Sequence, residues 1–206
     1  MAVESVIGRQ GRFSLKIVGG YRPNVRKLSS WMEDCLADYA CGRYRIASSL
    51  ETSGRGGVAH IDVAQAGFDV DVCGRKADLL VALDVPAILD HDALLDGNTV
   101  CLVADTRDDE DGIEHALSDE LRERVPKLLR KRRASGYWLP FCEEFLELEG
   151  PAFDGKLIAA QGATCKVMGI NGSGGAIADV RRTMNPGRCV SIAAVHSGAF
   201  AAIDHR

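Results

Sequence analysis

A glycine-flanked arginine is the first place where the residue types suggest chemistry. Arg55 follows Gly54 and precedes Gly56 and Gly57, and His60 comes shortly after. Glycine lets another molecule approach the backbone closely, and a guanidinium grips a carboxylate or phosphate with two parallel hydrogen bonds. We therefore predict that Arg55, Gly56, Gly57 and His60 contribute to a binding region for a substrate with a carboxylate or phosphate group. A hairpin turn with an exposed arginine and a hydrogen-bonded strand histidine are the alternatives.

A second glycine-rich loop lies near the end of the chain. It consists of Gly172, Ser173, Gly174 and Gly175. The pattern predicts a strand at 166–170 before it and a helix at 176–184 after it. Free N–H groups and a positive dipole end at such a helix start suit a phosphate, so this loop is a phosphate-loop candidate. Its spacing only approximates the dinucleotide fingerprint, and a tight structural turn is the alternative.

The elements that must position these loops are clearest between residues 77 and 104. Residues 77–83 and 99–104 are apolar runs of strand length, a pattern typical of strands buried on both faces. Asp84 and Pro86 favour a helix between them, with an apolar side that extends to Leu95. The order strand, helix, strand predicts a right-handed crossover with parallel strands. We expect these two strands to be neighbours at the centre of the sheet.

The segments before residue 77 extend this pattern. Residues 13–18, 44–48 and 58–63 are predicted strands, and the form Ser30-x-x-Glu33 predicts a helix that starts with a capping box. The fold class is therefore α/β: an open, mostly parallel sheet with helices on both faces in Rossmann-like layers, and a less regular C-terminal segment.

The chain is predicted to form a single domain over residues 1–206. Residues 13–105 are the best-supported β–α–β core, 106–150 a charged excursion with helices, and 151–206 the glycine-rich C-terminal segment.

A basic helix is predicted within the charged excursion. Its cations are Arg122, Arg124, Lys127, Arg130, Lys131, Arg132 and Arg133. Phosphates or an acidic partner would fit this run, and a solvated helix face is the alternative. An aromatic cluster of Tyr137, Trp138 and Phe141 follows, and we predict that it is buried, partly by another chain.

The composition argues against several classes of protein. The net charge of −4 makes nucleic acid an unlikely partner, and no apolar run approaches the length of a membrane helix. The seven cysteines form no C-x-x-C pair, and the five histidines lack metal-ligand spacing, so we predict no metal site in this chain. The N-terminus lacks the apolar core of a secretory signal, which predicts a cytoplasmic protein.

Two of these segments together resemble a known family. The Arg55-Gly56-Gly57 loop, followed by Ala77-Asp78-Leu79-Leu80-Val81-Ala82-Leu83-Asp84, is similar to the gamma subunit or gamma domain of the thiamine-dependent 2-oxoacid:ferredoxin oxidoreductases. The similarity covers residues 13–105. The chain departs from the family pattern after the first strand, where Gly19-Gly20-Tyr21-Arg22-Pro23 replaces the full glycine turn.

The resemblance implies a subunit of an assembly that oxidatively decarboxylates a 2-oxoacid to an acyl-CoA. The implied partners are alpha- and beta-type oxidoreductase subunits and a ferredoxin-like subunit. They would hold thiamine diphosphate, Mg²⁺ and the iron–sulfur clusters, while this chain alone binds none of them and has no catalytic residue of its own. Coenzyme A is a candidate ligand near Arg55, Gly56 and Gly57. The alternative function is a free-standing regulatory or scaffold module that binds coenzyme A or a nucleotide.

Overall fold

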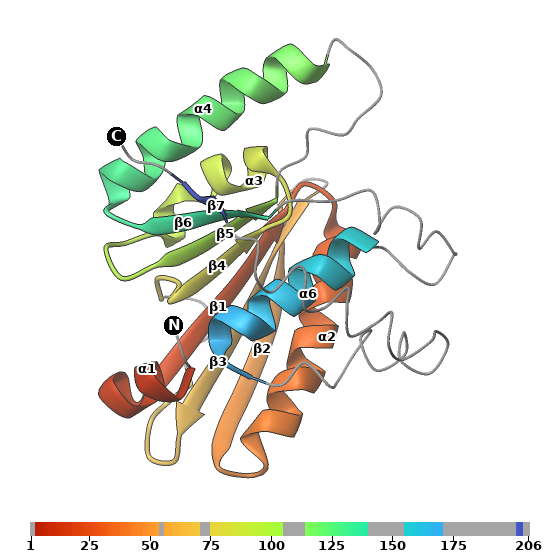
Figure 1. Ribbon diagram of the computed structural model, residues 1–206. Helices are drawn as coiled ribbons and strands as arrows, with labels where there is room; N and C mark the ends of the chain where they lie inside the picture. Colours follow the sequence, from red (N-terminus) through yellow and green to blue (C-terminus); the bar gives the residue numbers. More distant parts are fainter. Residues whose placement is uncertain are drawn as a thin grey trace.

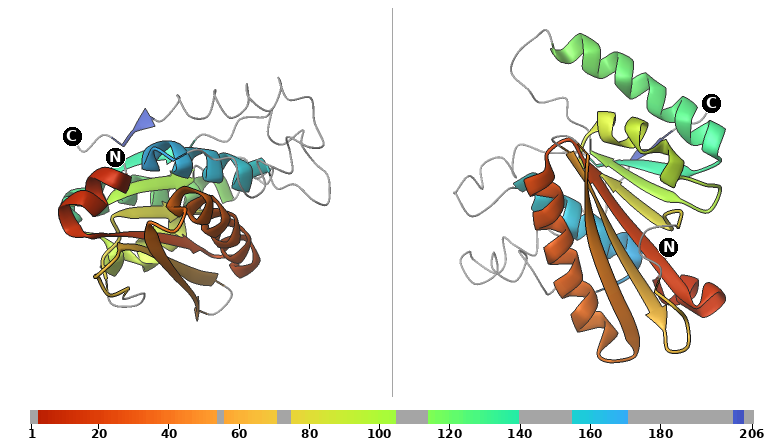
Figure 2. Two further views of the ribbon diagram at one scale, coloured as in Figure 1. Left: turned by 90° about the horizontal axis from the view of Figure 1, so that it is seen from below. Right: turned by 180° about the vertical axis from the view of Figure 1, so that it is seen from behind.

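A seven-stranded sheet with the strand order β2-β3-β1-β4-β5-β6-β7 forms the middle of the molecule (Figure 1). The structure is a computed structural model, and it describes residues 3–53, 56–70, 75–104, 114–139, 155–170 and 201–203. Helices cover both faces of the sheet (Figure 2). The predicted α/β class, with an open sheet between helices, is confirmed.

Four neighbouring strands of the sheet are parallel. They are β1 (Arg12–Gly19), β4 (Leu79–Ala82), β5 (Val100–Ala104) and β6 (Ser135–Leu139). The outer strands run antiparallel to their neighbours: β3 (Gly56–Gln65) pairs with β1, β2 (Tyr44–Ser53) pairs with β3, and β7 (Ala201–Ala202) pairs with β6. The chain therefore adds a hairpin to one side of a parallel core.

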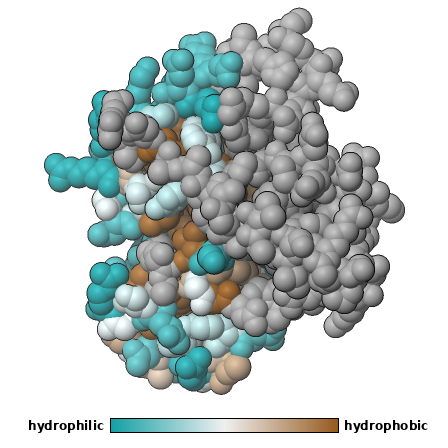
Figure 3. Space-filling model, in the orientation of Figure 1, coloured by the Kyte–Doolittle hydropathy of each residue, from teal (hydrophilic) through white to brown (hydrophobic). Residues whose placement is uncertain are grey.

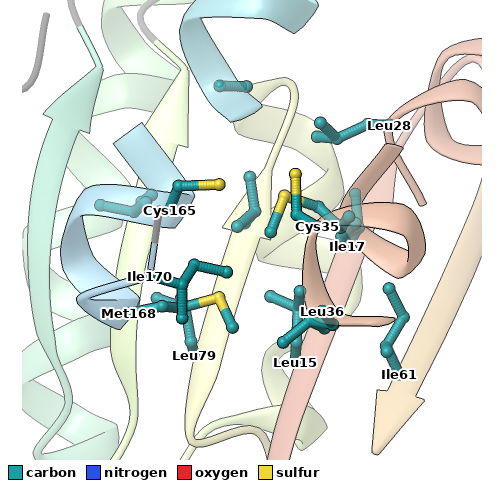
Figure 4. Close-up of a cluster of buried hydrophobic side chains, with 14 of the residues drawn as sticks. Leu15, Ile17, Leu28, Cys35, Leu36, Ile61, Leu79, Cys165, Met168 and Ile170 are labelled. Carbon is teal, nitrogen blue, oxygen red and sulfur yellow. The ribbon is translucent and has the colours of Figure 1, made fainter. Parts of the chain in front are cut away.

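Three helices pack on one face of the sheet. They are α1 (Val3–Gln10), α2 (Arg22–Ala40) and α6 (Gly155–Met168). In Figure 4, side chains of β1, α2 and α6 converge in this core, among them Leu15, Leu36 and Met168. Burial of such apolar side chains stabilises each by roughly 1.5–3 kcal/mol relative to exposure.

The opposite face carries a second core under α3 (Val85–Asp90) and α4 (Glu114–Arg132). A short 3₁₀ helix, η1 (Asp92–Leu94), follows α3. The view in Figure 3 shows hydrophilic residues around the described rim, with apolar residues toward the middle. None of the helices in the described part of the chain is long and apolar enough to cross a lipid bilayer.

The central strands agree with the sequence prediction. β4 and β5 are parallel neighbours near the middle of the sheet, and Leu80 and Leu102 have no exposed surface. The helix between them is shorter than predicted, because α3 ends at Asp90 instead of continuing to Leu95. The Leu94 carbonyl accepts a hydrogen bond from the Ala77 N–H at 2.9 Å, so the chain leaves the helix to meet the start of β4.

The predicted capping box is wrong. α2 begins at Arg22, with Pro23 in its first turn, and Ser30 lies inside the helix. A proline preorganises the first helical turn, so the helix starts earlier than the Ser30-x-x-Glu33 pattern indicates. Glu33 instead accepts a hydrogen bond from the Ser29 hydroxyl at 3.0 Å.

The strand predicted at 166–170 is also wrong, because α6 runs through Met168. Its buried residues recur at helical spacing, as with Ala160, Ala163 and Thr164, and α6 packs against α2. The predicted helix at 176–184 lies outside the described residues, as do Asp105 and Phe141.

The basic helix is confirmed as α4, and Pro126 lies within it. The Arg132 guanidinium forms an ion pair with Asp92, with 2.6 Å between Nη2 and Oδ2. The Cζ atom of Arg122 lies over the Trp138 ring, 4.5 Å from its centroid. Arg130, Lys131 and Arg132 occupy the last turn, where cations interact favourably with the helix dipole. Tyr137 and Trp138 are partly buried in β6. Burial by another chain stays a prediction.

Candidate functional site

The end of β1 and the start of β3 bring two glycine pairs together where the parallel strands have their carboxyl ends. This end of the sheet is called the Gly19–Gly57 edge. Gly19 pairs directly with Gly57 across the antiparallel ladder, and Gly20 and Gly56 are their neighbours in sequence. The predicted Gly56–Gly57 site therefore lies beside the turn that leads into α2. Arg55 lies outside the described residues, so its contact with an anion stays a prediction.

Close packing explains why glycine occupies these positions. A Cβ atom at Gly57 would lie 3.3 Å from Cγ of Arg22 and 3.3 Å from the Glu51 carbonyl oxygen. A Cβ atom at Gly19 would lie only 2.9 Å from Cγ2 of Val25. The aliphatic part of the Arg22 side chain thus lies over Gly57 of the β2–β3 hairpin, and a side chain at residue 57 would crowd it.

Asp84 fixes the turn after β1. Its Oδ2 accepts a hydrogen bond from the Gly20 N–H at 2.6 Å, and its Oδ1 accepts one from the Ala87 N–H at 2.8 Å. The predicted cap of α3 is therefore confirmed, and the same carboxylate also joins the ends of β1 and β4. An exposed edge held by such charge-assisted bonds is preorganised.

Asp78 plays the corresponding role at the other end of β4. Its Oδ2 accepts a hydrogen bond from the Ser14 N–H at 2.8 Å, and Arg75 lies 3.7 Å away. Burial raises the pKa of Asp78, while the Ser14 bond and Arg75 oppose that rise. The two aspartates of the Ala77–Asp84 segment thus both hold β1 in place, which is a structural role.

The two helices that start at this edge differ in charge. The N-terminus of α3 is capped by Asp84, whereas Tyr21 at the start of α2 makes no side-chain capping bond. The first turn of α2 contains no acidic residue, and its first two turns carry Arg22, Arg26 and Lys27. Because a helix N-terminus carries a partial positive charge, an anion at this edge is favoured at α2.

Two of the exposed large apolar side chains flank the same place. Tyr21 is 61% exposed and Leu50 is 37% exposed. Cδ1 of Leu50 lies 3.7 Å from where a Cβ atom of Gly57 would stand. The edge therefore combines cations, close backbone and apolar surface, a combination that suits a ligand with both anionic and apolar parts.

His60 lies in the sheet and not at this edge. Only 3% of the residue is exposed, and it pairs with Lys16 on β1. Its Nε2 lies 3.5 Å from Oε1 of Glu51. Burial, and then the Lys16 charge, lower the pKa of His60, so the ring is neutral near pH 7. Contact between His60 and a substrate stays a prediction.

Lys16 and Asp62 continue this buried polar row. Their Nζ and Oδ1 atoms are 3.8 Å apart, and neither side chain has more than 6% of its surface exposed. The alternation of residues 58–63 predicts that His60 and Asp62 share one face, which is confirmed, since Ala59, Ile61 and Val63 belong to the opposite core. The sequence gives no sign of the buried lysine that faces them.

The remaining candidates lie elsewhere. Gly172, Ser173, Gly174 and Gly175 fall outside the described residues. In the described ranges, no three His, Cys, Asp or Glu side chains are placed to hold a metal ion. A cavity of about 420 Å³ opens between α4 and β6, away from the Gly19–Gly57 edge; its lining is Asp119, Arg122, Glu123, Pro126, Trp138 and Ile203.

Sequence reasoning missed Tyr21 and Arg22 as members of this edge. Their position was visible: two glycines end a strand and a proline opens the next helix, which places the residues between them at the carboxyl end of the sheet.

Comparison with known proteins rests on structure, because no protein-family model and no curated sequence matches the chain. The fold is similar to the PORC subunit of pyruvate oxidoreductase from Thermotoga maritima, with a TM-score of 0.53 and 11% identity over 95% of this chain and 100% of that one. It is also similar to the gamma subunit of a keto/oxoacid ferredoxin oxidoreductase from Geobacter sulfurreducens, with a TM-score of 0.50 and 17% identity over 91% and 93%.

A third similar structure is 2-oxoglutarate:ferredoxin oxidoreductase from Magnetococcus marinus, solved with 2-oxoglutarate, coenzyme A and succinyl-CoA bound. The TM-score is 0.50 with 12% identity over 91% of this chain, which spans 30% of that longer one. The resemblance to gamma subunits expected from the sequence is confirmed at the level of the fold.

Proposed function

We propose that this chain is a gamma-type subunit of a multi-subunit 2-oxoacid:acceptor oxidoreductase, which oxidatively decarboxylates a 2-oxoacid to an acyl-CoA. The observation that carries the proposal is a fold similarity that covers 95% of this chain and 100% of the PORC subunit chain of pyruvate oxidoreductase. Fold alone does not define function. The proposal gains support because the residues that carry the sequence resemblance, Gly56, Gly57 and Asp84, gather at one edge.

The proposed role of this edge is to help shape the substrate and coenzyme A region. Coenzyme A carries phosphates and a long uncharged arm with methyl and methylene groups, and a 2-oxoacid carries a carboxylate. Arg22, Arg26 and the uncapped start of α2 would attract the anionic groups, while the exposed Tyr21 would meet apolar ones. Thiamine diphosphate, Mg²⁺ and iron–sulfur clusters belong, in this proposal, to alpha- and beta-type and ferredoxin-like partner chains.

Purification of the chain from its native source tests the assembly. We expect thiamine diphosphate-binding and ferredoxin-like chains to co-purify with it. An isolated chain that turns over a substrate without partners would contradict the proposal. Calorimetry of the isolated chain with coenzyme A and with NAD(P) would reveal whether it instead acts as a free-standing binding module.

Arg55 tests the edge itself. We expect Arg55→Lys and Arg55→Ala to change the free energy of unfolding by less than about 1 kcal/mol, yet to lower turnover or assembly of the complex, because lysine cannot form the two-pronged grip. Arg9→Ala on α1 is a matched control that should leave turnover unchanged. If Arg55→Ala unfolds the chain while the surviving complex works normally, Arg55 is a structural residue.

A further inference from the structure

The two outermost strands of the sheet, which form its lateral edges, differ in length. β7, at one edge, contains two residues, whereas β2, at the other, contains ten. In the part of the chain that the structure describes, no strand pairs with the outer side of β2. Every second residue of an edge strand directs its N–H and C=O away from the sheet, so a long edge offers a template for another strand.

β2 lacks the features that usually block an edge. It contains no proline and no lysine, and its pairing with β3 is continuous from Tyr44 opposite Gln65 to Ser53 opposite Gly56, without a bulge. Short length, proline, bulges and charged side chains, above all lysine, are the common protective devices. The charges of β2 are one cation, Arg45, and one anion, Glu51, which attract each other across a pair of antiparallel copies. An unprotected ten-residue edge favours a partner strand.

The residues of β2 are complementary to a second copy of β2 running in the opposite direction. With Ser48 opposite its own copy, Arg45 faces Glu51 and Ile46 faces Leu50, while Ala47 faces Ser49. Opposite charges and apolar pairs directly across a ladder are the stabilising combinations. The register also sets even-numbered residues opposite even-numbered ones, as an antiparallel ladder requires.

The faces of the strand agree with this register. Ile46 and Leu50 pair with Val63 and Ala59, which belong to the core under α2, so both lie on that face. Arg45 and Glu51 lie on the opposite face, and both are exposed. Ser48, at the proposed axis, is exposed as well. Pairing would cover Leu50, and the α2 helices of the two copies would flank the new ladder on the same face.

We propose that two copies of this chain associate through β2, antiparallel about a two-fold axis at Ser48, so that their sheets become continuous. The interface is isologous, because each Arg45 meets the partner's Glu51 and each Glu51 meets the partner's Arg45. Backbone hydrogen bonds provide affinity, and the side-chain pairs set the register. This inference stands apart from the proposed function, since it depends on β2 alone.

A cysteine substitution tests the axis. In full-length protein, Ser48→Cys should form an intermolecular disulfide under mild oxidation, because residues opposite each other have Cα atoms about 4.5–5.5 Å apart, within disulfide range. Thr52→Cys is the matched control: the two copies of residue 52 would lie roughly 26 Å apart at 3.3 Å per residue, so they should not crosslink above the wild-type background.

Charge exchange tests the register independently of cysteine chemistry. Arg45→Glu should raise the dimer dissociation constant about tenfold or more, because two attractive pairs become repulsive. The double variant Arg45→Glu/Glu51→Arg restores opposite charges and should recover most of the affinity. Arg124→Glu on α4, which packs near β6 at the far side of the sheet from β2, makes the same charge change and should have little effect. Sedimentation equilibrium measures all four proteins, and circular dichroism verifies their folding.

Three results would overturn the inference. A wild-type chain that stays monomeric at the highest soluble concentration rules out the dimer. A dimer whose affinity is the same in Arg45→Glu uses another surface. Equal crosslinking of Ser48→Cys and Thr52→Cys rules out the axis at Ser48.

Discussion

The parallel centre of the sheet and its antiparallel side obtain stability in different ways. β4 and β5 bury apolar residues on both faces, and their burial alone accounts for their position. β1 and β3 bury an apolar row under α2, whereas their other face buries Ser14, Lys16, His60 and Asp62 between the apolar Val18 and Val58 and the start of β1. Buried polar groups destabilise a fold unless they are paired. The antiparallel side therefore depends on electrostatics, and the parallel centre does not.

The pairing on the antiparallel side is incomplete. Ser14 Oγ, both ring nitrogens of His60 and both carboxylate oxygens of Asp62 are buried without a hydrogen-bond partner, although Asp62 lies within ion-pair distance of Lys16 and His60 within that of Glu51. Most buried polar groups in folded proteins have partners. We expect this side of the sheet to respond to charge and pH and the centre to respond to volume.

The largest expected effect is a charge placed in the centre. Leu102→Asp should reduce the free energy of unfolding by about 4 kcal/mol or more, because Leu102 has no exposed surface and its neighbours across the two ladders, Val81 and Tyr137, carry no positive charge. Leu102→Met, which nearly conserves volume, should cost less than about 1.5 kcal/mol. Urea denaturation measures both. Similar losses for the two variants would mean that Leu102 is not in an apolar centre.

Removal of one member of the buried ion pair should have the next largest effect. Lys16→Ala leaves Asp62 buried with its charge uncompensated, which typically costs about 3–5 kcal/mol.

The double variant Lys16→Met/Asp62→Leu is the control, because apolar residues of similar size remove both charges together. We expect it to be more stable than Lys16→Ala in the same urea titration. A double variant at least as unstable as the single one would show that the Lys16–Asp62 contact does not limit stability on this side.

The smallest expected effect is a pH dependence from His60. Its pKa lies below the ordinary 6.5 because of burial and the Lys16 charge, so the unfolded chain binds more protons than the folded one in the window below that value. Stability should therefore fall as the pH drops below about 6.5 and stay level above it.

His60→Gln should flatten this dependence between pH 5 and 7.5, where urea midpoints are measured. The difference from wild type isolates His60, because Asp78, whose raised pKa acts in the opposite direction, is present in both proteins. An unchanged slope in His60→Gln would assign the dependence to other groups.

The sequence predicted the parallel centre well because several signals coincide there. Two apolar runs enclose Asp84 and Pro86, and a strand buried on both faces leaves no ambiguity about which side faces the core. When local preference and tertiary environment agree in this way, the structure of a segment can be predicted from its sequence.

Predictions failed where local patterns were ambiguous. The run before Gly169 contains only a few residues of β-branched or apolar character, and short apolar runs suit strand and helix equally. α6 is helical because its small residues pack against α2, a tertiary contact that no local pattern records. The start of α2 was misplaced because a capping pattern inside a helix is indistinguishable from one at its start.

The candidate site was predictable in its members but not in its geometry. The glycines at 56 and 57 could be identified from their types, yet their partner Gly19 is fixed by a register between β1 and β3 that depends on the whole ladder. The face of His60 followed from alternation, but its burial depends on Lys16, which lies on another strand.

Asp78 and Asp84 both accept backbone hydrogen bonds from β1 or the turn after it, and this limits the insertions and deletions that the segment between them can tolerate. Ser14 donates to Asp78 and Gly20 donates to Asp84, and each pair is separated by the same 64 positions. A one-codon insertion or deletion between the two aspartates would detach at least one of them and turn the apolar side chains of β4 to the wrong faces. Descendants of this sequence should therefore keep the distance between the two aspartates even where the residues between them change.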